Sequence, residues 1–399
     1  MERELMSKSY ILQCAAVLIL VVAISPAVLC QENGAGGGAA PQSGSSSQPV
    51  SGSQRQARNA TSPQSEPRSP QLKTAPGGTN RQIVLDVQVT DKSGAPVRGL
   101  QQQDFTLLDD KQPQPITSFQ AVDHSALPPG DTPVEVILVV DAVNASYSSV
   151  SFERDQMKRW LLQNEGHLAQ PTSLILFTDS GAKIQNAPSE DGKALAAAYD
   201  QLEVGLKTTT RAQGFYGAAD RFDMSLRAIR EMAAYEADRP GRKLVIWISP
   251  GWPLLTGPNV ELTDKNEQQL FQSIVAISGE LRQARMTLYD IDPLGVADAG
   301  SLRVSYYEEF VKGVPSAPHA QAANLSLQVL AVQSGGRVLN STNDITSAIA
   351  ACAQDANAFY VVSFTAPRAD RANEFHSLEM KADKPRIMVR TRTGYYAQP

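Results

Sequence analysis

Short, almost wholly apolar runs in the middle of the chain alternate with segments of helical periodicity. The apolar runs cover residues 134–140, 173–177, 243–248, 286–291 and 358–364, and a shorter one covers 337–339. The helical segments cover residues 152–163, 192–203, 217–237, 266–284, 320–334 and 344–354. An apolar run of this length is typical of a strand buried on both faces, as in parallel sheets covered by helices. The alternation predicts a doubly wound α/β domain with a mostly parallel, Rossmann-like sheet over residues 131–366.

The regions on either side of this domain have a different pattern, in which apolar and polar residues alternate. Residues 83–89, 105–108 and 116–119 precede the domain, and residues 376–381 and 386–391 follow it. A period of two is typical of half-buried antiparallel strands, and such small β units are not stable alone. We therefore predict that an N-terminal β unit (81–130) and a C-terminal β segment (367–399) pair into one small β-sandwich.

The first 80 residues predict export and disorder. Arg3 and Lys8 precede an apolar stretch at residues 11–24, which is shorter than the roughly 20 residues of a membrane span. We expect residues 1–30 to be a cleaved signal peptide, which leaves no membrane span in the mature chain. An uncleaved anchor and a lipid on Cys30 are the alternatives. Residues 31–80 are rich in Gly, Ser, Pro and Gln, which predicts a disordered linker.

Composition narrows the classes of partner. The formal net charge is −5 and no cluster of Lys and Arg is present, which argues against nucleic acid as a partner. Cys352 is the one thiol clearly left after the signal segment, so no internal disulfide is expected. The pattern predicts that Cys352 packs as a small apolar residue on a helix. Whether the exported chain stays periplasmic, lies on the cell surface or is secreted is left open.

Four separated pieces of sequence carry a resemblance to a known family. They are residues 84–111, which include Asp91, Gly94 and Asp104, and then residues 138–144, 240–249 and 389–397. In this order they resemble the acidobacterial family of von Willebrand factor A-related proteins, and the match extends over residues 81–398. The resemblance implies a von Willebrand factor A-like fold, an exported protein and a possible metal-ion-dependent adhesion site.

The adhesion site of type A domains combines an Asp-x-Ser-x-Ser motif with a later Thr and a later Asp around Mg²⁺, a cation that prefers oxygen ligands. Asp141 matches the first aspartate, but Val143 and Ala145 stand in place of the two serines. The later strand ends in Ser249, Pro250 and Gly251, without an aspartate, and residues 208–210 could supply the threonine. The resemblance therefore predicts a degenerate site and no bound cofactor.

A rebuilt cation site is an alternative at the same edge of the sheet. Asp141, Asp290 and Asp292 all end predicted parallel strands, where ligands bind in open α/β sheets, and Asn144 and Ser146 could add neutral oxygens. These five residues are the candidate metal ligands, for Mg²⁺ or Ca²⁺. They could equally cap helices and turns, or line a polar groove that holds no metal.

Catalytic motifs are missing from the sequence. His124, His167, His319 and His376 are scattered, and no nucleophile elbow, phosphate-binding loop or zinc-binding pair accompanies them. A solvent-exposed nucleophile near one of these histidines would indicate a hydrolase. We expect a protein that is not an enzyme and that mediates protein–protein interaction or envelope scaffolding through the carboxyl edge of its sheet. The alternative is an adhesin that depends on a divalent cation.

Overall fold

The computed structural model describes residues 81–126, 134–184, 187–203, 214–255, 262–294, 305–340 and 342–399. The predicted signal peptide, the predicted linker and residues 208–210 lie outside the described residues. Among the described helices, none is both long enough and apolar enough to cross a membrane.

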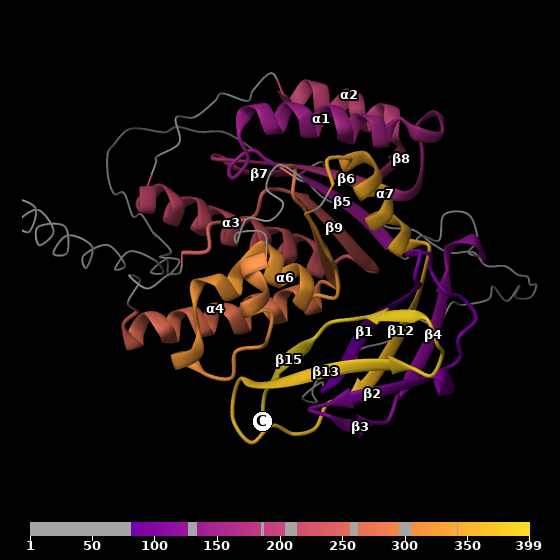
Figure 1. Ribbon diagram of the computed structural model, residues 1–399, viewed down its shortest axis with the longest axis vertical. Helices are drawn as coiled ribbons and strands as arrows, with labels where there is room; N and C mark the ends of the chain where they lie inside the picture. The colour runs from indigo at the N-terminus through magenta and orange to yellow at the C-terminus, as the bar shows by residue number, and fades with distance from the viewer. Residues whose placement is uncertain are drawn as a thin grey trace, which may run out of the picture. The chain divides into compact units, whose positions relative to one another are not determined.

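A mostly parallel sheet lies between two layers of helices (Figure 1). Along the chain its described strands are β5 (Val134–Asp141), β6 (His167–Thr178), β7 (Gly181–Ile184), β8 (Ser189–Asp191), β9 (Arg242–Ile248), β10 (Met286–Ile291) and β11 (Val338–Leu339). Side by side they run β7-β6-β5-β9-β10-β11, and β8 pairs with β6. Strands β7 and β8 are antiparallel to β6, and the other pairings are parallel. Without β8 this is the order 3-2-1-4-5-6 of doubly wound sheets, which confirms the predicted von Willebrand factor A-like, Rossmann-like fold class.

Helices cover both faces of this sheet (Figure 1). One layer holds α1 (Tyr147–Leu161), α2 (Gly192–Glu203) and α7 (Ile345–Ala353), and the other holds α3 (Gly214–Ala237), α4 (Asp264–Gln283) and α6 (Leu327–Gln333). Strand β5 supplies both layers, because successive side chains of a strand point to opposite faces. Leu138 and Val140 pack into the hydrophobic core under α1, α2 and α7, whereas Ile137 and Val139 pack into the core under α3, α4 and α6. Cys352 is fully buried in the first of these cores, as its apolar neighbours predicted.

The two ends of the described chain form a β-sandwich. Its strands are β1 (Gln82–Asp91), β2 (Phe105–Asp109), β3 (Gln112–Gln114), β4 (Ser118–Asp123), β12 (Ala358–Thr365), β13 (Glu374–Ala382), β14 (Ile387–Arg390) and β15 (Gly394–Ala397). One sheet has the order β14-β1-β12-β4 and the other β15-β13-β2-β3. In the pairing of β1 with β14, Val89 lies opposite Val389, and in that of β2 with β13, Leu107 lies opposite Met380. Each sheet thus joins N-terminal to C-terminal strands, which confirms the predicted composite sandwich.

Strand β12 belongs to a different sheet from the one predicted. Its apolar run was expected to end the parallel sheet, but it pairs antiparallel with β1 and β4 in the sandwich. Tyr360, Val362 and Phe364 fill the sandwich core, while Phe359 and Val361 pack against the core of the α/β layer. The strand is therefore buried on both faces without belonging to the parallel sheet, and hydrophobicity alone does not distinguish these two situations.

Two helices differ most from their predicted starting residues. Helix α1 starts at Tyr147, well before the expected residue 152, because Ser146 caps it. The helix expected over residues 320–334 is divided into a 3-10 helix, η8 (Ala322–Leu325), and α6. Ser326 has the extended backbone angles φ −67° and ψ 153° and separates the two.

A buried polar network joins the sandwich to the α/β layers. Asp355 Oδ2 accepts hydrogen bonds from Tyr289 Oη and Arg390 Nη2, each at 2.7 Å. Arg242 Nη1 donates to the backbone oxygen of Asp355 at 3.2 Å and to Gln88 Oε1 at 3.3 Å. Because buried polar networks fix one arrangement of the groups they join, this contact specifies how the sandwich meets the central sheet.

Candidate functional site

The carboxylate of Asp141 lies at the carboxyl end of β5 and accepts five hydrogen bonds. Oδ1 accepts from the backbone nitrogens of Val143 at 2.9 Å and Asn144 at 2.8 Å. Oδ2 accepts from Asn144 Nδ2 at 2.9 Å, Trp247 Nε1 at 3.0 Å and Ser249 Oγ at 2.9 Å. The residue is fully buried between β5 and β9, where the strand order reverses. In open α/β sheets this switch point is the usual place for a ligand.

The donors around Asp141 occupy its coordination capacity. An ionised carboxylate offers about four lone-pair directions, and five N–H and O–H groups already point at this one. Burial raises the pKa of the Asp141 carboxyl, while the hydrogen bonds from Asn144, Trp247 and Ser249 act in the opposite direction. A cation could reach Asp141 only by displacing several of these donors. Ser249, at the strand end that lacks the expected aspartate, is one of them.

The two residues in place of the motif serines are buried in apolar cores. Val143 is 5% exposed and lies in the core under α3, α4 and α6. Ala145 is fully buried in the core under α1, α2 and α7. The exposed Ser146 caps α1, since its Oγ accepts a hydrogen bond from the backbone nitrogen of Ser149 at 3.1 Å. Ser146 therefore caps a helix, which is one of the alternatives predicted for it from the sequence.

The other two candidate carboxylates lie on β10 and directly after it. Asp290 is fully buried, and Asp292 is 3% exposed. Asp292 Oδ1 accepts a hydrogen bond from the backbone nitrogen of Leu294 at 2.9 Å, which shapes the turn after the strand. Strand β9 separates β10 from β5, so the structure brings Asn144 to Asp141 but does not gather the three aspartates into one cluster.

A different cluster lies inside the sandwich. Among the described residues, one group of three possible metal-ligating side chains has its ligand atoms within 4.8 Å of one another, and it consists of Asp109, Asp110 and His376. His376 Nδ1 lies 2.9 Å from Asp109 Oδ1 and 3.4 Å from Asp110 Oδ2. Tyr395 Oη donates to Asp109 Oδ2 at 2.7 Å, and Ser377 Oγ donates to Asp110 Oδ1 at 2.9 Å. Each carboxylate thus has one oxygen fixed by a neighbour and the other directed at the imidazole.

Sequence reasoning missed this cluster, although a signal for it existed. Asp109 and Asp110 lie within residues 84–111 and were not among the candidate ligands, and His376 was counted as one of four scattered histidines. The predicted pairing of the two β segments already brought their strands together, and Asp109 lies opposite Leu378 in that pairing. His376 is two positions from Leu378 and therefore points to the same face of the sheet. The register, which the sequence did not reveal, was the missing information.

One histidine lies beside a hydroxyl group, the feature expected of a hydrolase. Ser316 Oγ is 3.0 Å from His319 Nδ1. Both residues belong to one turn around the 3-10 helix η7 (Ala317–His319), and His319 is exposed. Within the described part of the chain, no carboxylate lies within 4.0 Å of the His319 ring to orient it. The pair lacks the third group that positions the base in catalytic triads.

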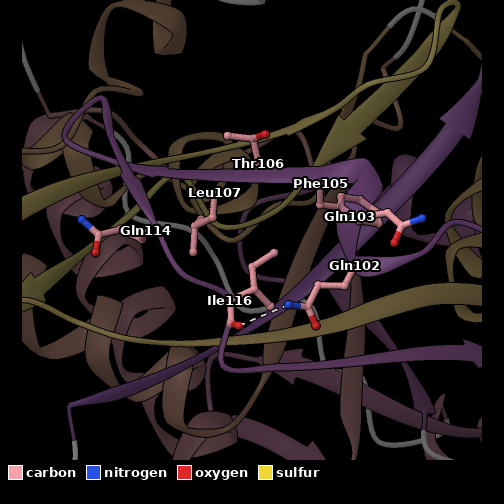
Figure 2. A pocket seen from close by; sticks show the side chains of 7 residues that line it. All are labelled: Gln102, Gln103, Phe105, Thr106, Leu107, Gln114 and Ile116. Carbon is pink, nitrogen blue, oxygen red and sulfur yellow. Dashed lines mark hydrogen bonds between the residues drawn. The ribbon is translucent and has the colours of Figure 1, made fainter.

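An open groove of about 520 Å³ lies on the sandwich (Figure 2). The neutral polar side chains along it are Gln102, Gln103, Thr106 and Gln114, and the apolar ones are Phe105, Leu107 and Ile116. Gln102, in the 3-10 helix η2 (Gln102–Asp104), donates through Nε2 to the backbone oxygen of Ile116 at 3.3 Å (Figure 2). No ionisable side chain lines the groove, so its chemistry suits contact rather than acid–base catalysis.

Comparison with known proteins gives matches of structure alone. No family model matches the sequence, and no curated protein matches it. Among solved structures, the chain is similar to the human COPII-coat protein Sec24c, at 9% identity and a TM-score of 0.33, covering 70% of this chain and 46% of that chain. It is similar to the pilus adhesin SpaC from Lactobacillus rhamnosus GG, at 10% identity and a TM-score of 0.33, covering 74% and 42%. It is also similar to the SpRpn10 VWA domain, at 9% identity and a TM-score of 0.21, covering 40% and 73%.

The chain thus spans less than half the length of the Sec24c and SpaC chains that it matches. At these identities the likeness concerns the fold alone. The von Willebrand factor A-like class of the described residues follows from their own strand order and helical layers.

Proposed function

We propose that this chain is an exported, non-catalytic binding module that contacts a protein partner through the carboxyl edge of its parallel sheet, without a bound cation. Interaction with a soluble partner and scaffolding in the cell envelope are the two forms that this binding can take. The apolar stretch at residues 11–24 and the polar spacer at residues 31–80 support export. An intact mass beginning at Gln31 in exported protein would establish the cleavage.

The observation that carries the proposal is the set of five hydrogen bonds to Asp141. In type A domains with an adhesion site, the cation at this position presents an open coordination position to a carboxylate of the partner. Here Trp247 and Ser249 donate to the carboxylate instead, at 3.0 and 2.9 Å. The buried hydrogen bonds around Asp141 hold the loops at this edge in place. Rigid scaffolds that position loops are typical of binding proteins.

Site-directed photo-crosslinking tests the edge directly. A photo-reactive residue at Ser180, in the exposed turn between β6 and β7 at the carboxyl edge, is expected to capture the partner in cells that make the protein. The matched control is the same residue at Asp238, which is exposed near the start of β9 at the opposite edge. Capture at Ser180 that persists in EDTA supports the proposal. Loss of capture in EDTA, or equal capture at Asp238, would contradict it.

The cluster of Asp109, Asp110 and His376 supports a second candidate, a module that depends on a cation held in the sandwich. Carboxylate oxygen together with imidazole nitrogen suits Zn²⁺ or Mn²⁺ better than Mg²⁺. Tyr395 and Ser377 already orient the two carboxylates, as outer-shell partners do in metal sites. Asp110→Asn is the variant to use, because that side chain is 52% exposed. A rise in melting temperature with Zn²⁺ or Mn²⁺ that this variant abolishes would favour the second candidate.

A further inference from the structure

Arg392 is a buried cation that makes few hydrogen bonds and no ion pair within the described chain. It lies between β14 and β15, in the terminal piece of sequence that carries the family resemblance, and it is 8% exposed. Within the described chain, its guanidinium makes one hydrogen bond, from Nη1 to the backbone oxygen of Ser278 at 3.4 Å. A guanidinium has five N–H donors, so most of its donor capacity is unused.

A second arginine lies on the same side of helix α4. Ser278 and Arg282 are four residues apart on this helix and therefore share one face. Since Arg392 contacts Ser278, its guanidinium lies over the face that carries Arg282. Arg282 is partly buried, and among the described residues no carboxylate lies within 4.0 Å of either guanidinium. Burial and the positive charge of Arg282 lower the pKa of Arg392 to about 10, so the Arg392 guanidinium remains charged at neutral pH.

Asp86 is the carboxylate whose charge acts on Arg392, and it already has an ion-pair partner. Asp86 forms a salt bridge with Arg285, the residue that follows α4 by two positions. The backbone oxygen of Asp86 accepts a hydrogen bond from Thr391 Oγ1 at 3.0 Å, which holds this pair beside Arg392. Asp86 is thus already neutralised by Arg285, which leaves Arg392 and Arg282 as two positive charges without an ion pair among the described residues.

The other buried cations of the described chain have close partners. Arg242 donates to Gln88 Oε1 and to the backbone oxygen of Asp355, and it lies over the ring of Phe359. Lys243 Nζ donates to the backbone oxygens of Glu236 and Arg239. Arg392 differs from both, although taking a cation out of water costs free energy unless hydrogen bonds and opposite charge compensate it.

We propose that Arg392 and Arg282 bind a doubly charged oxyanion, phosphate or sulfate, in the seam between α4 and the sandwich. The excess of two positive charges matches such an anion. The planar guanidinium fork donates paired hydrogen bonds to tetrahedral oxyanions, which is why arginine predominates in such sites. The bound anion joins α4, through Arg282, to the C-terminal strands, through Arg392. The site is independent of the carboxyl edge and of the function proposed for it.

Thermal melts of the purified protein test this site. Low millimolar phosphate or sulfate, against chloride at equal ionic strength, is expected to raise the melting temperature saturably by about 2–4 °C. Arg392→Met, which keeps the volume and removes the charge, should lose this rise and show at least tenfold weaker phosphate binding by calorimetry. Arg230→Gln is the matched control, because it removes an equally positive but exposed side chain. This control should keep the full rise.

Arg282→Gln provides a second variant if Arg392→Met does not fold, because the Arg282 side chain is only partly buried. It should also reduce the rise. The absence of any rise in the wild-type protein would overturn the proposal. An equal rise in the wild-type protein and in both seam variants would overturn it as well, since anions excluded from the surface stabilise proteins without a site.

Discussion

Asp141 and Arg392 are both buried charged side chains, but they differ in how many hydrogen bonds the protein provides for them. Asp141 is fully buried and accepts five hydrogen bonds of 2.8 to 3.0 Å. Arg392 is 8% exposed and makes one hydrogen bond of 3.4 Å within the described chain. Neither has an oppositely charged side chain within 4.0 Å.

The difference separates a buried charge that the protein surrounds with hydrogen-bond donors from one to which its described residues offer a single acceptor. Neutral donors with fixed positions can stabilise a buried carboxylate, because each one offsets part of its lost hydration. At the carboxyl edge the protein's own backbone and side chains supply all five hydrogen bonds to the carboxylate. In the seam beside α4 the protein supplies few acceptors, and an external anion would complete the set.

Removing the carboxylate of Asp141 is expected to have the largest effect. Asp141→Ala leaves Trp247 Nε1, Ser249 Oγ and Asn144 Nδ2 without their acceptor in a buried site. We expect the free energy of unfolding to fall by about 3–4 kcal/mol, since each unsatisfied buried donor costs about 1–3 kcal/mol. Urea denaturation measures the loss. The control Ser146→Ala removes an exposed helix cap and should cost about 1 kcal/mol. Equal losses of unfolding free energy for the two variants would contradict this expectation.

Restoring the motif serines should destabilise the fold rather than rebuild a cation site. Val143 and Ala145 lie in two apolar cores, so an added hydroxyl group would be buried among apolar side chains. We expect Val143→Ser and Ala145→Ser to cost about 1–3 kcal/mol each in denaturant melts, the usual cost of burying an unpaired polar group. Val143→Ala separates lost volume from the added hydroxyl. A stable double variant that binds Mg²⁺ would show that the two serines are enough to restore a cation site at the carboxyl edge.

Asp109 gives an intermediate case, a buried carboxylate held by Tyr395 and His376. Tyr395→Phe removes the hydroxyl that donates to Asp109 Oδ2 at 2.7 Å. We expect a loss of about 1.5–3 kcal/mol, the range for hydrogen bonds to charged groups. Tyr396→Phe is the adjacent control, because that hydroxyl donates to the backbone oxygen of Val314 at 3.2 Å. Its loss should be smaller, about 0.5–1.5 kcal/mol, and the reverse order would contradict the assignment.

The smallest expected effect is that of Mg²⁺ or Ca²⁺ on stability. Melting curves in EDTA, Mg²⁺ and Ca²⁺ should superimpose, because the donors around Asp141 leave no open position for a cation. A cation bound at 100-fold excess over its dissociation constant would add about 2.7 kcal/mol, which such melts detect readily. A rise with Mg²⁺ that Asp292→Asn abolishes would restore the alternative of a rebuilt site.

The sequence predicted the elements of the central domain well where the periodicity was unambiguous. Strand β10 and helix α2 have the predicted ends, at residues 286 and 291 and at residues 192 and 203. The pairing of the two ends also followed from the pattern, since two half-buried β units each need a partner. Strand β15 was missed, because a four-residue strand is too short to show a period.

The site was less accessible to sequence reasoning than the fold. Asp141 was placed at a strand end correctly, but its contacts with Trp247 and Ser249 depend on the register between β5 and β9, in which Val139 lies opposite Trp247. Trp247 had been counted only as an apolar residue of a buried strand. A side chain that is apolar over most of its surface but donates one hydrogen bond does not stand out in a hydrophobicity pattern.

The pairing of β1 with β14 has a consequence for the time course of folding. Gln88 and Arg390 pair across about 300 residues of chain, and β2 likewise pairs with β13. A ribosome that adds about 5–20 residues per second needs roughly 15–60 s to make the stretch between them. During that interval β1 lacks both of its partners, β12 and β14, and β2 can pair only with β3. Pairings this distant in sequence also close slowly, so the sandwich should be the last part of the protein to form.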